Sequence, residues 1–223
     1  MTLETPDQFY TDAQRAMQRD QGREALADTV FTAIVSDEMD AAARAFIESR
    51  DFFFLGSVDG GGMPTVSYKG GPVGVVRTEG PKRLLFPGYD GNGMYKSMGN
   101  LSEMGRVGLL FIDLETPNRI RVQGTASVTC NPDVIGRWPG AKMAAIVEVE
   151  QVFLNCARYI HKHARIETSP YVPDGEGTQP HPAWKRIDMV QPALSEAERA
   201  RTEAEGGTID FDGYAERLMQ GRS

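Results

Sequence analysis

The sequence predicts a mainly β (α+β) protein, in which an antiparallel six- or seven-stranded barrel carries flanking helices. The first observation is a series of short segments with the composition of strands. The second is that short turns join most of them, which favours antiparallel pairing in a closed or nearly closed barrel. The third is residues 119–128, where apolar and polar side chains alternate strictly, as in a half-buried strand.

Two helical segments precede the strands. Residues 6–34 have helical composition, with a break expected at residues 20–22. The second helix has Ser36 and Asp37 as N-cap candidates and ends near Arg50. Its expected buried face consists of Met39, Ala43, Phe46 and Ile47.

The strand series begins with a predicted hairpin. The apolar run 52–58 is followed by the turn sequence DGGGMP and by a returning strand over 65–69. Further strands are predicted over 73–77, 83–86, 107–113, 119–128 and 146–153, and a short helix capped by Asn131 is predicted before the last of them.

The composition changes after about residue 170, where proline and glycine become frequent. A charged helix with a Ser195/Glu198 capping box follows, and then a final helix over 212–220. We therefore expect one domain with three regions. These are N-terminal helices packing on the barrel (1–50), the cofactor-binding barrel (51–168), and an excursion with C-terminal helices (169–223).

Composition and charge exclude several classes of protein. The chain has 223 residues, of which 40% are hydrophobic and 25% charged, and a net charge of −7. That charge argues against nucleic acid or an anionic membrane as a partner. No apolar run has membrane-spanning length and the first residues do not resemble a signal peptide, so we expect a cytoplasmic protein. Cys130 and Cys156 form no zinc-binding pattern, and no metal site is expected.

A candidate anion site lies where a glycine-rich turn leads into a short helix. Asn92, Lys96 and Ser97 stand at this junction. A helix N-terminus carries unpaired N–H groups and partial positive charge, so an added cation and hydroxyl make a plausible phosphate clamp. The alternative is an ordinary turn with a routine N-cap and a solvated lysine.

Four sequence pieces occur in the order typical of one family. They are SYKGGP (67–72), DGNGMYKSMGNL (90–101), RVGLLF (106–111) and NRIRVQGTA (118–126). Over residues 45 to about 165 the chain resembles the pyridoxamine 5′-phosphate oxidase-like family. The resemblance implies a split β-barrel that binds FMN, and a homodimer with the FMN site at its interface.

The resemblance also implies roles for particular residues. One strand would supply cofactor contacts, the turn and helix start would hold the 5′-phosphate, and the start of the alternating strand would approach the flavin ring. In that order, the matching residues are Ser67, Tyr68 and Lys69; Asn92, Lys96 and Ser97; and Asn118 and Arg119. By looser analogy, residues 155–163 are the candidates for contacts from the second subunit.

Two departures from the family pattern bear on activity. Ser67 stands where true pyridoxamine phosphate oxidases have an arginine, and no Arg-x-His element occurs in the chain. We therefore expect an FMN-dependent oxidoreductase that acts on a different small molecule, and no catalytic side chain is identified. The alternatives are a flavin-binding module without turnover and a protein that binds a deazaflavin instead of FMN.

Overall fold

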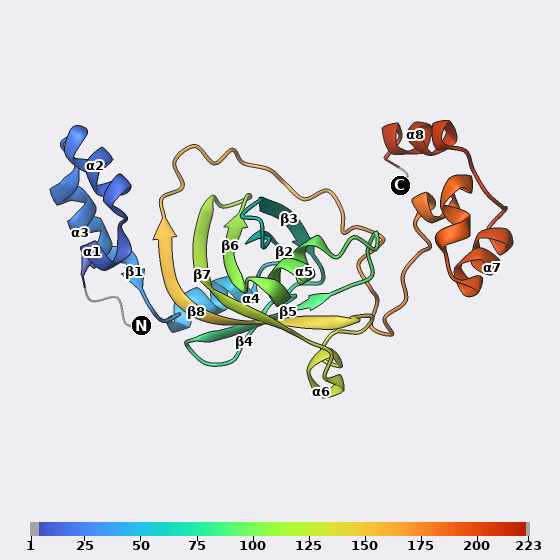
Figure 1. The fold of residues 1–223 in the computed structure, drawn as a ribbon, viewed down its shortest axis with the longest axis horizontal. Helices are drawn as coiled ribbons and strands as arrows, with labels where there is room; N and C mark the ends of the chain where they lie inside the picture. The colour runs from blue at the N-terminus through green and yellow to red at the C-terminus, as the bar shows by residue number, and fades with distance from the viewer. Residues whose placement is uncertain (1–4, 222–223) are drawn as a thin grey trace.

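The structure is a computed structural model that describes residues 5–221. Its centre is an antiparallel sheet that curls into a barrel, so the predicted fold class is confirmed (Figure 1). The strands are β1 (Val35–Ser36), β2 (Phe52–Val58), β3 (Pro64–Gly70), β4 (Arg77–Thr78), β5 (Arg83–Gly88), β6 (Arg106–Asp113), β7 (Asn118–Thr129) and β8 (Met143–Asn155). Their order is β3-β2-β6-β7-β8-β5-β4, with β1 paired to β8.

Helices flank the barrel, some at the two ends of the chain and some between the strands (Figure 1). They are α1 (Pro6–Phe9), α2 (Asp12–Asp20), α3 (Glu24–Ile34), α4 (Ala41–Glu48), α5 (Lys96–Glu103), α6 (Pro132–Ile135), α7 (Glu196–Ala204) and α8 (Phe211–Met219), with the 3-10 helices η1 (Ala183–Arg186) and η2 (Asp188–Ala193). No helix within residues 5–221 is long and apolar enough to cross a membrane.

The core of the barrel consists of the inward-facing side chains of the strands, together with apolar side chains of α4 and α5. Phe53 on β2 lies between Phe86 and Phe111, with ring centroids 5.0 and 5.4 Å away. Ile47 of α4 and Leu101 of α5 join the same core cluster. Both helices are therefore held to the barrel by apolar burial, which is the main stabilising term in folding.

Strand β7 has the predicted alternation, interrupted by one bulge. Ile120 and Val122 are buried, whereas Arg121 is exposed. The register with β8 shifts between Gln123 and Gly124. A Cβ on Gly124 would lie only 2.1 Å from the carbonyl oxygen of Glu148, so the bulge requires glycine.

Two predictions about local structure were wrong. Residues 73–76 form a turn and not a strand, because Pro72 lacks an N–H and Gly74 has a left-handed φ of +79°. The helix predicted to begin after Ser36 begins after Asp40, whose carboxylate accepts a hydrogen bond from the Ala43 N–H. Ser36 belongs instead to β1, the strand that the sequence did not reveal.

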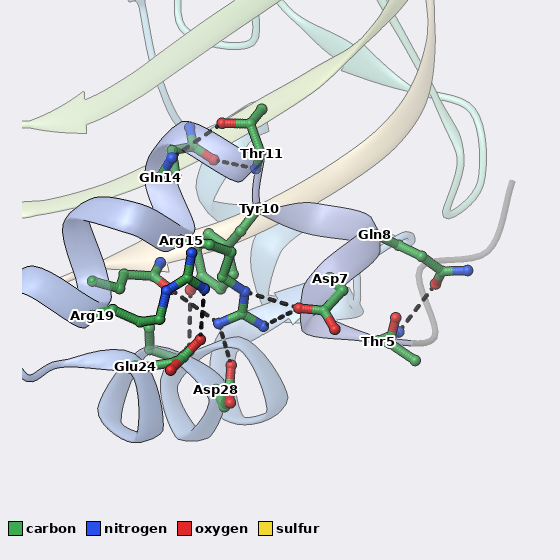
Figure 2. A network of polar contacts seen from close by, with 12 residues as sticks. Thr5, Asp7, Gln8, Tyr10, Thr11, Gln14, Arg15, Arg19, Glu24 and Asp28 are labelled. Atoms are coloured by element: carbon green, nitrogen blue, oxygen red, sulfur yellow. Dashed lines mark hydrogen bonds and ion pairs between the residues drawn. The ribbon is translucent and has the colours of Figure 1, made fainter.

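The three N-terminal helices are held together around one arginine (Figure 2). The Arg15 guanidinium pairs with Asp7 at 2.7 Å and with Asp28 at 2.6 Å, and it lies over the Tyr10 ring. The predicted break between α2 and α3 is confirmed. These helices meet the barrel at the end of β8, where the rings of Phe9 and Phe153 are 5.8 Å apart.

The C-terminal helices lie beyond one end of the barrel (Figure 1). A segment without helix or strand, residues 156–182, leads to them. The predicted Ser195/Glu198 capping box is present in α7. The division into three regions stays a prediction, and residues 1–4 and 222–223 of the outer regions lie outside the described residues.

Candidate functional site

The glycine-rich loop and α5 create an uncapped helix N-terminus. Asn92 does not cap the helix; its Oδ1 accepts a hydrogen bond from the Met94 N–H at 3.1 Å. Tyr95 holds the N-cap position in a left-handed conformation, with φ of +49° and no capping side chain. Lys96 and Ser97 are the first residues of the helix. The orphan N–H groups of this turn are therefore available to an anion.

Strand β3 lies beside this helix start. The Oγ atoms of Ser67 and Ser97 share a hydrogen bond of 2.9 Å, which joins two of the predicted site segments directly. Helix α5 is fixed in turn by Asn100, whose buried amide donates to the Ser57 Oγ of β2. The strand and the helix therefore hold the two serine hydroxyls in one place.

Lys69 is the most unusual group of the site. It lies opposite Phe53 in the β2–β3 register and is half-buried. Burial lowers the pKa of its ammonium, and within residues 5–221 the ammonium has no carboxylate or other polar partner. A desolvated cation without a counter-ion is costly, which is typical of a group that awaits an anionic ligand.

These side chains line one cavity of about 400 Å³. Six of the eight predicted residues contribute to it: Ser67, Tyr68, Lys69, Asn92, Lys96 and Ser97. Its apolar wall includes Phe53, Val75, Pro87, Met98 and Met143, which the sequence did not single out. Their only signal in the sequence was an apolar character that every core residue shares.

Asn118 and Arg119 do not line this cavity. They begin β7, which β2 and β6 separate from β3. The Asn118 Oδ1 accepts a hydrogen bond from the Arg119 N–H, and the Arg119 Nε is buried and has no hydrogen-bond partner among residues 5–221. A flavin contact from these two residues remains a prediction.

No group of three or more metal-ligating side chains that could hold an ion comes together within the described chain. His161 and His163 lie in the exposed segment after β8 and not on a strand. Residues 155–163, the candidates for second-subunit contacts, continue from the end of β8 into this segment.

The predicted role of Lys96 as a phosphate ligand of FMN can be tested by mutation: replacing Lys96 by alanine should weaken FMN binding by about tenfold, the value of one charge-assisted hydrogen bond on a partly exposed group. Lys96 already forms an ion pair with Asp59, with 3.6 Å between the Lys96 Nζ and the carboxylate. Fluorescence titration with FMN measures the change. The matched control is Asp59→Asn, which removes the competing charge and should leave FMN binding equal or tighter. A loss of affinity in both variants would mean that the turn, and not the charge of Lys96, supports the site.

A comparison with known families and structures identifies the family of the chain. A family profile described as pyridoxamine 5′-phosphate oxidase matches residues 39–169, more than half of the chain. No curated protein matches. Among solved structures, HupZ of Group A Streptococcus is similar at 18% identity, covering 56% of this chain and 99% of its own, with a TM-score of 0.45. An FMN-binding protein of Syntrophomonas wolfei is similar at 15% identity, covering 63% and 97%, with a TM-score of 0.42. On the extent of the profile match, the chain belongs to the pyridoxamine 5′-phosphate oxidase family.

Proposed function

We propose that this protein is an FMN-dependent oxidoreductase that acts on a small molecule other than pyridoxamine phosphate. The observation that carries the proposal is the half-buried Lys69 ammonium, which faces a cavity beside an uncapped helix N-terminus and has no counter-ion within residues 5–221. In a protein of net charge −7, such a cation suits an anionic ligand. Family membership makes FMN the first candidate.

The residues present fit a phosphorylated flavin. The phosphate is nearly a dianion, and Lys69 with Lys96 would offset that charge. Within the Ser67–Ser97 pair, the hydroxyl that accepts the shared hydrogen bond keeps its own proton to donate to the phosphate, and the first N–H groups of α5 would donate as well. When bound, FMN supplies the chemistry of hydride or two-electron transfer, so the chain's own residues need only bind, orient and shield.

The site is proposed to be completed by a second copy of the chain. Large apolar side chains surround the cavity and are exposed: Tyr68 (63%), Met94 (67%) and Tyr95 (60%), with Val66 (74%) further along β3. Exposed apolar groups that gather at one site are typical of an interface. Light scattering should therefore give twice the 24.5 kDa mass of the chain; a monomer that binds FMN with full affinity would contradict this part of the proposal.

Anaerobic mixing with a reduced nicotinamide tests the oxidoreductase role. We expect the absorbance of bound FMN to bleach with NADH or NADPH and to return when an acceptor is added. A protein that binds FMN tightly but whose flavin neither donor reduces would be a binding module without turnover.

A further inference from the structure

A second and larger hollow lies next to the cofactor cavity. It has a volume of about 1210 Å³ and separates one end of the barrel from the C-terminal region. On the barrel side it is lined by residues 49–52, the loop 89–92 and the β6–β7 turn. On the opposite side it is lined by residues from the segment 163–182, by η1 and by α7. Tyr68 and Tyr89 line both hollows, so a molecule in the larger one would lie against the cofactor cavity.

The C-terminal region is fastened across this cleft by one buried lysine. The Lys185 Nζ donates to Asp90 at 2.6 Å and to Glu198 at 2.9 Å, and only 8% of the Lys185 side chain is exposed. Asp90 belongs to the glycine-rich loop that leads to α5, whereas Glu198 belongs to α7. The ion pair of Lys185 with Asp90 therefore links the two walls of the cleft.

Aromatic side chains stand on both walls. They are Phe52, Tyr68, Tyr89, Tyr171 and Trp184. Tyr68 is stacked on Phe52, with the ring centroids 5.3 Å apart and the planes at 15°. Such rings favour a flat partner, because offset and edge-to-face contacts between aromatic groups add to the gain from burial.

Most of the cations that line the cleft are paired with carboxylates of the protein itself. Four of the five lysine and arginine side chains of the cleft are paired in this way, as follows: Arg50 with Asp113 (2.9 Å), Arg165 with Asp51, Lys185 with Asp90 and Glu198, and Arg201 with Glu205 (2.9 Å). The fifth, Lys142, is exposed to water. Six aspartate and glutamate side chains line the same cleft. A substrate phosphate or carboxylate would find no desolvated free cation there.

We propose that this cleft binds an uncharged, planar aromatic molecule, and that this is the substrate class of the enzyme. The proposal rests on the proposed function, since only a bound flavin would make the ligand a substrate. It also gives a physical reason to expect no turnover of a phosphate ester such as pyridoxamine phosphate. An anionic ligand would have to break an internal ion pair, remain unpaired, or pair with Lys142, which is exposed to water, where an ion pair contributes little.

A pair of probes with the same rings tests the proposal: naphthalene-2-carboxamide, which is neutral, and naphthalene-2-carboxylate, an anion. Calorimetric titration of the full-length protein loaded with FMN should show the amide binding at least about fivefold more tightly. Tyr171→Ala should lower the affinity for the amide by about three- to tenfold, the range for one aromatic contact. Phe211→Ala is the matched control, because Phe211 lies in the C-terminal region, is 60% exposed and does not line the cleft.

A charge variant makes the test sharper. Asp51→Asn releases Arg165 and should tighten binding of the carboxylate by about three- to fivefold while leaving the amide unchanged. Equal affinity for both probes, no binding of either, or insensitivity to Tyr171→Ala would overturn the proposal. FMN occupancy is measured on the same samples. Failure of the probes with FMN bound therefore contradicts only the substrate class, whereas failure to bind FMN contradicts the proposed function.

Discussion

Lys69→Met should weaken FMN binding by about ten- to a hundredfold and yet leave the cofactor-free protein at least as stable as the wild type. The affinity falls because a charge-assisted hydrogen bond or ion pair is lost, at about 1.5–3 kcal/mol. The stability does not fall because the ammonium has no partner to lose within the described residues. Methionine also has a flexible unbranched side chain of similar length, so it suits the same position opposite Phe53 in the β2–β3 register.

The sign of the pH effect follows from the lowered pKa. Burial makes the folded state bind the Lys69 proton more weakly than the unfolded state does. The charged lysine therefore destabilises the fold at neutral pH, and this cost disappears as pH rises from the folded pKa toward the unfolded value near about 10.4. Lys69→Met removes the cost at every pH, so its advantage in thermal midpoint should be largest near pH 7 and shrink in alkaline solution.

Thermal melts without cofactor and fluorescence titrations with FMN measure the two effects. Arg23→Met is the matched control, because Arg23 is an exposed cation of the N-terminal helices and does not line the cavity. Unchanged FMN affinity in Lys69→Met would remove this lysine from the site. A lower melting temperature without cofactor would mean that Lys69 has a structural role.

Phe111→Ala should lower the free energy of unfolding by about 3–5 kcal/mol, the cost of removing a fully buried ring. Phe111 is completely buried and packs against Phe53, which in turn lines the cofactor cavity. For a chain of this length the midpoint of thermal unfolding should fall by roughly 6–20 °C.

Urea unfolding of the variant measures this loss directly. Phe211→Ala serves as the control, because the Phe211 side chain is 60% exposed, and it should cost less than about 1 kcal/mol. A loss near that of the control in Phe111→Ala would mean that the barrel interior is not packed as described.

The strands were predictable because their signals are local. The 52–58 and 65–69 hairpin and the alternation after residue 119 each lie within a few residues, and the structure has all of them. The strand predicted at residues 73–76 was wrong because an apolar run has the same composition in a buried turn as in a strand. Val75 and Val76 are buried, but Pro72 and Gly74 set the backbone.

That six of the predicted residues line one cavity also follows from local signals. Lys96 and Ser97 follow a glycine-rich turn that marks the helix start, and Ser67 lies on a strand next to that helix. The larger cleft could not be predicted, since it forms between residues far apart in the chain. Asp51 with Arg165 and Asp90 with Lys185 are the clearest cases.

The most direct measurement is an absorbance spectrum of the purified protein, with mass identification of the molecule that heating releases and an FMN titration of the stripped protein. We expect a flavin spectrum, release of FMN, and rebinding of FMN that Lys69→Met weakens. A colourless protein that fails to bind added FMN would contradict the account. Release of a deazaflavin would contradict FMN as the cofactor while leaving the phosphate site in place.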